Sequence, residues 1–276
     1  MASAAGRVPE WRTVTLGRQQ LRVARWPGDA RATPLLFFNG IGASLELLSP
    51  LAQALPGTPI IAFDIPGVGL SPARWLPYRL WNMARLAGRL LDHLGIGRVD
   101  VLGVSWGGTL AQQFVLQNPR RCRRLVLAAT AQGAWMVPGR LKVLRHFISP
   151  RRHNDAAHRE CIAGEIYGGR ARTDPQLMNS LHDCIKPTSR YGYLLQQLAV
   201  AGWCSVPWLP LLRQPTLILA GNDDPVVPLI NARLMHKLIR RAHLHVFDDG
   251  HLFILSQPEA TASVLQQFLR AGTAHG

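Results

Sequence analysis

The sequence predicts an α/β fold in which helices cover both faces of a mostly parallel sheet and a helical lid is inserted into the chain. From about residue 34 to residue 130, continuous apolar runs alternate with amphipathic segments, as is typical of parallel strands buried on both faces. This alternation stops at about residue 131 and resumes after about residue 213. With 276 residues, 47% of them hydrophobic, the chain is long enough to build one substantial core.

Six apolar runs are the expected strands. The first ends at Asn39-Gly40 and the second at Asp64, which are residues that favour turns. The runs cover residues 34–38, 60–63, 99–104, 125–129, 216–220 and 244–247. Helices are expected between the early strands, over residues 45–55, 80–94 and 109–118. The apolar positions of the second of these segments recur with the period of a helix.

The stretch between the fourth and fifth runs is expected to form a helical lid over the carboxyl edge of the sheet. It is rich in tryptophan and arginine and has no apolar run of strand type. The predicted division is therefore a core of residues 1–130 and 214–276 with a lid of residues 131–213.

The formal net charge of +15 does not by itself identify a partner. The basic residues are almost all arginine and lie in short clusters without a nucleic-acid-binding motif, so nucleic acid is the least favoured partner. A solvated basic surface and attraction to an anionic surface both remain open. The N-terminus lacks a signal-peptide pattern and no apolar run reaches the roughly 20 residues of a membrane span, so we expect a cytoplasmic protein without a transmembrane segment.

The cysteine and histidine patterns do not predict a metal site or any other cofactor. Four cysteines are too widely spaced for a CxxC site and are expected to be reduced packing residues: Cys122, Cys161, Cys184 and Cys204. His243-x-His245 lies on an expected strand and is more typical of an exposed strand face than of metal ligation.

A candidate nucleophile follows the third run directly. Gly103-Val104-Ser105-Trp106-Gly107-Gly108 contains GxSxG between an expected strand and an expected helix. Small residues suit a tight turn, and the helix N-terminus would favour an anion that develops beside Ser105. In this context the motif resembles the nucleophile turn of the α/β hydrolases, which implies that fold for the chain.

The resemblance implies the chain order serine, acid, histidine, with the acid and the histidine after late strands. Asp224 follows the fifth run and His251 follows the last one. His251 is therefore the expected general base and Asp224 the residue that orients it. Asp224 is preferred to Asp223 because the family's Gly-x-x-Asp spacing selects it, and Asp223 remains open as an alternative. Asp248 and Asp249 are expected to cap a loop or contact the lid.

The turn after the first run is the expected source of oxyanion donors. In Asn39-Gly40-Ile41-Gly42, the amide of Ile41 is predicted to act together with the amide of Trp106. α/β hydrolases commonly carry His at the position of Asn39, but backbone amides do this work whichever side chain is present.

A dinucleotide site is a weak alternative for the same segment. Gly40-x-Gly42 with Asp64 further on imitates a dinucleotide-binding motif, but Leu45 stands where the third glycine belongs. The stretch Asp64–Ser71 also matches the D-x-P-G-x-G-x-S loop of α/β hydrolases, for which a structural role is expected.

Taken together, the segments resemble those of the intracellular depolymerases of medium-chain-length polyhydroxyalkanoates. The likeness extends from about residue 33 to residue 269 and includes the lid, where substrate choice is usually set. Matching stretches are residues 38–48, 62–69, 103–108, 125–131, 137–139, 149–152, 166–169 and 248–253. The resemblance implies hydrolysis of a polyester stored in granules, release of 3-hydroxyalkanoic acids through an acyl-enzyme, and association with the granule surface.

Four residues are candidate contacts of the aliphatic substrate. They are Asn39, which is part of the family pattern, and the tryptophans Trp135, Trp203 and Trp208 of the lid. Packing inside the lid is the alternative role for each tryptophan. The oligomeric state is not predicted.

Two other functions remain open at this stage. A carboxylesterase or lactonase acting on soluble acyl esters would use the same residues. A granule-binding scaffold on a hydrolase fold would need no catalysis, although the intact set of serine, histidine and aspartate argues against it.

Overall fold

The computed structural model describes residues 7–148, 156–174 and 188–271. They fold around one eight-stranded sheet with the order β1-β2-β4-β3-β5-β6-β7-β8. β1 and β2 pair antiparallel, as do β2 and β4, and the remaining neighbours pair parallel. The strands are β1 (Glu10–Leu16), β2 (Gln19–Trp26), β3 (Leu35–Phe38), β4 (Ile60–Phe63), β5 (Val99–Val104), β6 (Cys122–Ala128), β7 (Thr216–Gly221) and β8 (Ala242–Phe247).

β3 and β4 are apolar throughout because both of their faces are covered. In β3, Leu36 and Phe38 pack into one hydrophobic core, whereas Leu35 and Phe37 pack into a second core on the other face. Alternate side chains of a strand point to opposite faces, so each residue of a continuous apolar run has a core to enter. The α/β class with a mostly parallel sheet is confirmed.

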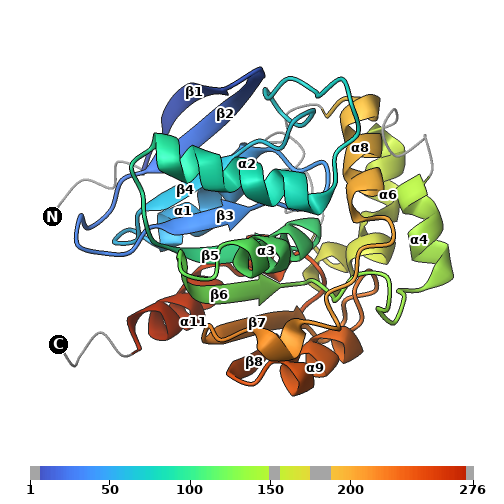
Figure 1. The fold of residues 1–276 in the computed structure, drawn as a ribbon. Helices are drawn as coiled ribbons and strands as arrows, with labels where there is room; N and C mark the ends of the chain where they lie inside the picture. Colours follow the sequence, from blue (N-terminus) through green and yellow to red (C-terminus); the bar gives the residue numbers. More distant parts are fainter. Residues whose placement is uncertain (1–6, 149–155, 175–187, 272–276) are drawn as a thin grey trace, which may run out of the picture.

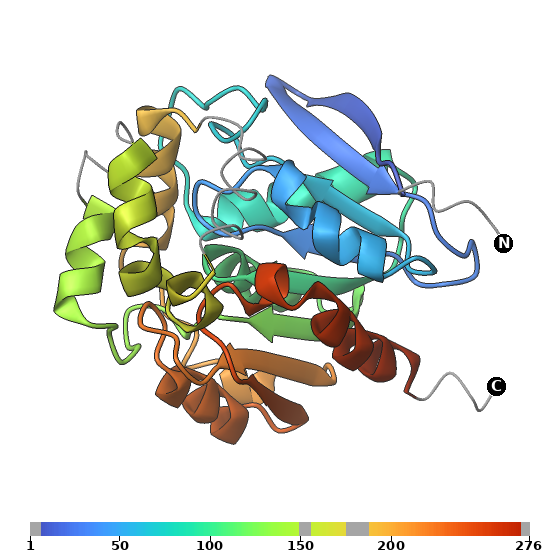
Figure 2. The same ribbon diagram turned by 180° about the vertical axis from the view of Figure 1, so that it is seen from behind.

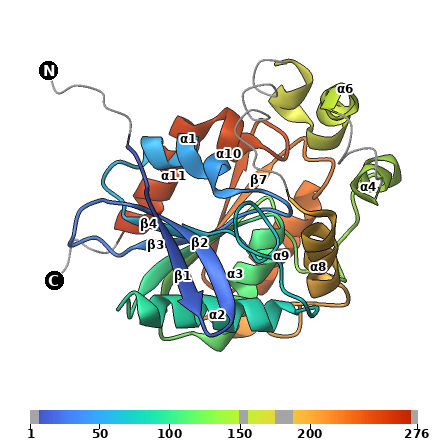
Figure 3. The same cartoon turned by 90° about the horizontal axis from the view of Figure 1, so that it is seen from above.

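Helices form a layer on each side of this sheet (Figures 1, 2 and 3). One core lies beneath α2, α3 and α9, and the other beneath α1, α10 and α11. The bounds are α1 (Ser49–Ala54), α2 (Leu80–His93), α3 (Trp106–Gln117), α9 (Leu229–Leu238), α10 (Phe253–Ser256) and α11 (Pro258–Arg270). α2 follows the amphipathic prediction, with its apolar stripe buried.

Several predicted boundaries differ from the observed ones. The segment predicted as one helix at residues 45–55 is a 3-10 turn, η1 (Leu45–Leu48), followed by α1 with Pro50 in its first turn. α3 begins three residues before the predicted start, directly after Ser105. β1 and β2 were not predicted, because polar residues interrupt both strands and leave no continuous apolar run. In β1, only Val14 and Leu16 are buried.

The chain between β6 and β7 is called the inserted segment (residues 129–215), and its described part contains helices but no strand. Most of its described helices gather beyond the carboxyl ends of β5, β6 and β7, whereas the last one lies beside α9 (Figures 1 and 2). They are α4 (Leu141–Ile148), α6 (Ala156–Tyr167), η2 (Gly169–Arg172), α8 (Arg190–Val200) and η3 (Leu209–Leu211). An isolated bridge between Gly133 and Cys204 joins the start of the segment to its later part. The matching stretch at residues 149–152 lies outside the described residues.

Two cysteine side chains are described, and both are free thiols. Cys122 is buried, and burial raises the pKa of its thiol, which suits a packing role. Cys204 is half-buried. Cys184 and the side chain of Cys161 lie outside the described part. Among the described residues, no helix combines the length and the hydropathy needed to cross a membrane.

Candidate active site

Ser105 occupies a strained turn between β5 and α3. Its φ of 53° and ψ of −119° lie outside the regions that a residue with a side chain normally adopts. The turn is possible because glycines stand two positions before and two positions after Ser105. A Cβ atom on Gly103 would lie 2.2 Å from the carbonyl oxygen of Gly107, and one on Gly107 would lie 2.1 Å from that of Phe38. The GxSxG spacing therefore reflects close approaches of backbone to backbone.

The end of β6 holds this turn in place from the side. The amide of Ser105 donates to the carbonyl oxygen of Ala128 at 2.9 Å, and the hydroxyl of Thr130 donates to the carbonyl oxygen of Ser105 at 2.7 Å. These bonds satisfy the backbone of a residue that belongs to neither the strand nor the helix. They leave the side chain of Ser105 at the carboxyl edge of the sheet.

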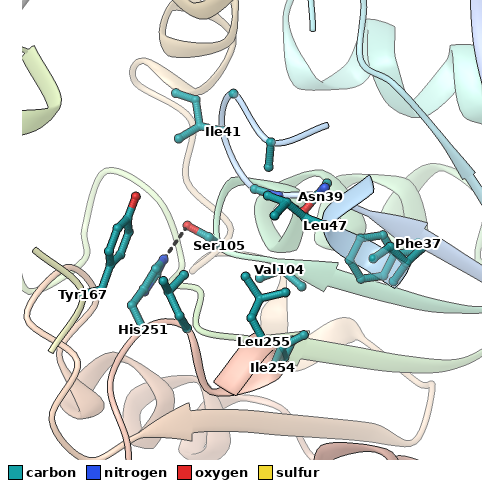
Figure 4. Close-up of a pocket in the computed structure, with 15 residues that line it drawn as sticks. Phe37, Asn39, Ile41, Leu47, Val104, Ser105, Tyr167, His251, Ile254 and Leu255 are labelled. Atoms are coloured by element: carbon teal, nitrogen blue, oxygen red, sulfur yellow. Dashed lines mark hydrogen bonds between the residues drawn. The ribbon is translucent and has the colours of Figure 1, made fainter. Parts of the chain in front are cut away.

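His251 lies between Ser105 and Asp224 (Figure 4 shows the first contact). Its Nε2 atom is 3.1 Å from Oγ of Ser105, and its Nδ1 atom is 2.7 Å from Oδ2 of Asp224. His251 and Asp224 are 7% and 6% exposed, so water screens their interaction only weakly. Three residues separated by up to 146 positions are thus brought into hydrogen-bond reach of one another.

The geometry distinguishes Asp224 from its neighbour. Oδ1 of Asp224 accepts the amides of Val226 and Val227 at 2.9 and 2.8 Å, which leaves Oδ2 directed at His251. Asp223 instead pairs with Arg172 and accepts the amide of Gly169. Asp224 is therefore the carboxylate placed to orient the histidine.

The loop that carries His251 rests on the inserted segment at Tyr167-Gly168-Gly169, called the Tyr-Gly-Gly corner. The amide of His251 donates to the carbonyl oxygen of Tyr167 at 2.7 Å. The Tyr167 ring stacks beside the imidazole, with centroids 6.4 Å apart and an interplanar angle of 16°. A Cβ atom on Gly169 would lie 2.0 Å from the amide nitrogen of Gly250, so only glycine permits this contact.

Asp249 links the same loop to the corner. Its buried carboxylate accepts the amides of Gly250 and Arg170 at 2.7 and 2.9 Å, as well as the side-chain donors of Ser256 and Gln257. Burial alone would raise the pKa of Asp249, but these hydrogen bonds outweigh it and lower the pKa. The predicted contact between this residue and the inserted segment is present, and it fixes the backbone just before His251.

The turn after β3 approaches Ser105 from the opposite side. A Cβ atom on Gly40 would lie 3.7 Å from the Cβ atom of Ser105. The side chain of Asn39 shapes the turn, since its Nδ2 donates to the carbonyl oxygen of Ser44 and its Oδ1 accepts the amide of Gly40. Ile41 follows, next to the space above Ser105 (Figure 4).

An apolar pocket surrounds Ser105 and His251 (Figure 4). Asn39, Ile41 and Tyr167 line it beside the reactive groups. Its apolar walls come from β3, η1, the end of β5 and the chain around α10, through Phe37, Leu47, Leu48, Val104, Leu252, Ile254 and Leu255. A pocket of this composition suits an aliphatic chain attached to a polar group that reacts at the serine.

A family model for the alpha/beta hydrolase fold matches residues 33–258. The chain belongs to the α/β-hydrolase family. Among curated proteins, this hydrolase is 51% identical to "Poly(3-hydroxyalkanoate) depolymerase" of Ectopseudomonas oleovorans over 94% of its own length and 92% of the relative's. The resemblance to polyhydroxyalkanoate depolymerases is thereby confirmed.

More distant relatives share the fold. The hydrolase is 31% identical to "2-hydroxy-6-oxo-2,4-heptadienoate hydrolase" of Pseudomonas putida, over 86% of this chain and 89% of the relative. The crystal structure of a hydrolase from Pseudomonas aeruginosa superimposes with a TM-score of 0.81 at 25% identity, covering 95% of this chain and 99% of the other.

The three tryptophans predicted to contact substrate do not line this pocket of the hydrolase. Trp203 and Trp208 pack edge to face, with ring centroids 5.9 Å apart, and Nε1 of Trp203 donates to Gln113 on α3. They pack against the main core rather than inside the lid, so their position also differs from the alternative role that the sequence left open. Trp135 is 69% exposed. The predicted substrate contacts of all three therefore find no support in their positions.

Asp64 has a structural role in this hydrolase, as expected. It is almost fully buried and accepts the amides of Leu45 and Leu70 at 3.1 and 3.2 Å, with Arg22 at 3.4 Å. Burial raises its pKa to about 6, even though these partners act to lower the pKa. A carboxylate enclosed in this way is not available for a nucleotide ribose. Across the described ranges, no group of three His, Cys, Asp or Glu side chains could hold a metal ion.

Proposed function

We propose that this α/β hydrolase cleaves the ester bonds of a polyhydroxyalkanoate and releases 3-hydroxyalkanoic acids. The observation that carries the proposal is the hydrogen-bonded series from Asp224 through His251 to Ser105 at an apolar pocket. The depolymerase relative, 51% identical over almost the whole chain, supports a polyester as the substrate. The apolar walls support aliphatic side chains on that polyester, as in medium-chain-length polymers.

Ser105 is the proposed nucleophile. Its Oγ attacks the ester carbonyl while Nε2 of His251 removes the hydroxyl proton, and Asp224 stabilises the imidazolium through Nδ1. The tetrahedral intermediate collapses when His251 gives this proton to the departing hydroxyl oxygen of the polymer. A water molecule then attacks the 3-hydroxyacyl ester on Ser105 by the same route, which releases the 3-hydroxy acid and regenerates the hydroxyl of Ser105.

The amides of Ile41 and Trp106 are the proposed donors to the oxyanion. Trp106 begins α3, so its amide belongs to the first helical turn, whose N–H groups lack partners within the helix. Gly40 brings the neighbouring turn to the side of Ser105. One donor of this kind contributes about 3 kcal/mol to transition-state stabilisation.

Residues 131–213 are the proposed lid, on a core of residues 1–130 and 214–276. Support comes from the position of the described inserted helices beyond the carboxyl edge of the sheet (Figure 3). Tyr167 contributes directly to the pocket wall. A segment placed in this way can control the access of polymer to Ser105.

Granule association in the cytoplasm is proposed from the surface of the hydrolase. The outer face of α8 and the loop before α2 expose large apolar side chains, which are Leu70, Trp75, Leu76, Tyr191, Leu194 and Leu198. α8 and this loop adjoin, because the hydroxyl of Tyr191 donates to the carbonyl oxygen of Trp75 at 2.6 Å. The net charge of +15 adds attraction to a granule that bears anionic lipid or carboxylates.

The experiment compares rates on a latex of medium-chain-length polyester with rates on p-nitrophenyl octanoate. We expect both to be hydrolysed, with 3-hydroxyalkanoic acids released from the latex and detected by mass spectrometry. Activity on the soluble ester alone would favour the carboxylesterase or lactonase alternative. Binding to latex without hydrolysis of either substrate would favour the scaffold alternative.

Replacing the nucleophile tests the chemistry itself. Ser105→Ala is expected to lower kcat on both substrates by at least about 10⁴-fold, because the remaining donors alone give little catalysis. A serine-directed phosphonate should add its mass to the peptide that contains Ser105 in the unmodified enzyme and not in the variant. An alanine variant with full activity would contradict the assignment.

A further inference from the structure

Gln196 of α8 contacts both halves of the proposed oxyanion site. It is fully buried, and its Oε1 accepts the amide of Gly42 at 2.8 Å. The backbone carbonyl oxygen of the same residue accepts the indole Nε1–H of Trp106 at 2.8 Å. One residue of the inserted segment is therefore bonded to the turn that contains Ile41 and to the residue that begins α3.

Gly42 is held by α8 and the chain just before it from more than one direction. The hydroxyl of Thr188 donates to the carbonyl oxygen of Gly42 at 2.8 Å. The ring of Tyr193 lies 3.2 Å from the place that a Cβ atom on Gly42 would occupy. With a φ of 68°, Gly42 is in the left-handed region that glycine adopts readily, so this turn needs outside contacts to fix one conformation.

These contacts restrict the direction of the Ile41 amide. The nitrogen that donates to Gln196 belongs to the peptide unit immediately after Ile41. Only the φ and ψ angles of Ile41 join this planar unit to the one that carries the Ile41 amide, so holding the first unit restricts the second. On the other side, the indole bond fixes the ring of Trp106 beside the first turn of α3. Oxyanion donors act only when they are already aimed at the position where charge develops.

We propose that Gln196 is a positioning residue of the oxyanion hole, through which the inserted segment sets the geometry of the Ile41 and Trp106 amides. The inference rests on the proposed function of the same site. Gln196 touches neither substrate nor the reacting atoms, and it acts through Gly42 and Trp106.

Burial of Gln196 has a cost that packing alone does not explain. Among the residues that the structure describes, its Nε2 has no hydrogen-bond partner although it is buried. Replacing the side chain by methionine removes this unpaired donor and leaves the amide of Gly42 unpaired instead, while the bond from Trp106 to the backbone carbonyl of residue 196 is kept, so the variant tests the contact to Gly42. Because one unpaired donor replaces another, the two effects on folding oppose each other, and stability should change little.

The test measures Gln196→Met against Gln197→Met, the same substitution at the next, half-buried position of α8. With p-nitrophenyl octanoate, Gln196→Met should lower kcat by about 10- to 100-fold and change KM by less than about twofold, since small misplacements of catalytic groups have effects of this size. Gln197→Met should behave like the unmodified enzyme. Both variants should retain the thermal unfolding midpoint to within a few degrees.

Two inhibitors separate transition-state from ground-state binding. An alkylboronic acid forms a tetrahedral adduct with the serine, so its affinity for Gln196→Met should fall by the same factor as kcat. Competitive inhibition by 3-hydroxyoctanoate, which does not form that adduct, should be unchanged. A purely structural role would alter the unfolding midpoint and both affinities together.

The outcomes that overturn the inference are distinct from those that overturn the function. Unchanged kcat and boronate affinity in Gln196→Met would refute the positioning role in an enzyme that remains active. If this variant does not fold, Thr188→Val removes a different contact to Gly42 and should lower kcat and boronate affinity in the same proportion. Failure of that correlation also refutes the role. An unmodified enzyme that hydrolyses no ester would instead overturn the proposed function, and the inference with it.

Discussion

At the scale of single residues, two adjacent aspartates differ in the partners of their side chains. Asp224 is buried against His251, whereas the side chain of Asp223 is 41% exposed and pairs with Arg172. A carboxylate that orients an imidazole contributes to each proton transfer, while an exposed ion pair contributes little.

Asp224→Asn should therefore lower kcat by about 10³- to 10⁴-fold on p-nitrophenyl octanoate, because the neutral amide favours the wrong imidazole tautomer. Asp223→Asn is the matched control, and its kcat should stay within about tenfold of the unmodified value, since the amide oxygen of asparagine can still accept the amide of Gly169 and the loss is the exposed ion pair with Arg172. Equal loss of activity in the two variants would show that the assignment of the acid is wrong.

Asp64 gives a prediction about pH. Its pKa is raised from 3.8 to about 6 in the folded protein, so the folded state binds a proton more tightly than the unfolded state does. Stability from this group is thus fully present below about pH 4 and is lost as the pH rises through about 6, by at most about 3 kcal/mol.

The measurement is the free energy of unfolding in urea at several pH values for the unmodified enzyme and for Asp64→Asn. Relative to the variant, the unmodified enzyme should lose stability between pH 4 and pH 7, because the carboxyl group of Asp64 loses its proton in this range and the amide side chain of the variant does not titrate. Taking the difference between the two proteins cancels the opposite trend expected from Asp249, whose pKa is lowered. A difference that does not vary with pH would contradict the prediction.

At the scale of elements, the Tyr-Gly-Gly corner joins the loops that follow β7 and β8. Gly168 has a φ of 66°, and a Cβ atom on it would lie 2.1 Å from the carbonyl oxygen of Asp223. Gly95, at the end of α2, has a φ of 68° and nothing within 4 Å of such an atom. The two glycines thus share a backbone conformation and differ in their surroundings.

Gly168→Ala should lower kcat by more than about tenfold, because the corner must move and the loop with His251 moves with it. Gly95→Ala should lower only the stability, by about 1 to 2 kcal/mol, the usual cost of the left-handed conformation. Steady-state kinetics and urea unfolding of both variants distinguish the effects. A Gly168→Ala enzyme that loses no more activity than Gly95→Ala would argue against the role of the corner.

The elements differ in how well the sequence predicts them. The strands from β3 to β7 are predictable because burial on both faces favours apolar runs, whereas β8 is a partly exposed edge strand of which only the later part was predicted. Ser105, Asp224 and His251 are predictable because each follows one of the predicted strands. β1 escapes prediction because water covers most of it. The roles of Gln196 and the corner depend on contacts between residues far apart in sequence, such as the 154 positions between Gly42 and Gln196, which no local pattern encodes.

At the scale of the whole molecule, the proposed granule surface combines charge with apolar side chains. Raising the salt concentration from about 0.05 to 0.5 M should weaken adsorption to the polyester latex several-fold, because screening shortens the reach of the positive charge. Hydrolysis of p-nitrophenyl octanoate should change little over the same range. Adsorption that does not depend on the salt concentration would show that the positive charge does not contribute to docking.

The apolar part of that surface gives a separate prediction. Leu194→Ser on α8 should reduce adsorption to the latex several-fold at constant salt, because it removes an apolar side chain of this surface that is 47% exposed. Leu116→Ser on α3, at a leucine of similar exposure, is the control and should adsorb normally. Equal adsorption by both variants would place the docking surface elsewhere.

The backbone bond between Tyr167 and His251 has a consequence for engineering new specificities by recombination. A chimera that takes its inserted segment from a distant family member would lose Tyr167, and His251 of the retained core would then lack the backbone contact that holds its loop. Fusion points chosen only at the ends of β6 and β7 should therefore give folded but poorly active hybrids. Grafts that retain residues 167–172 together with the loop before α10 should keep turnover while exchanging the rest of the insertion.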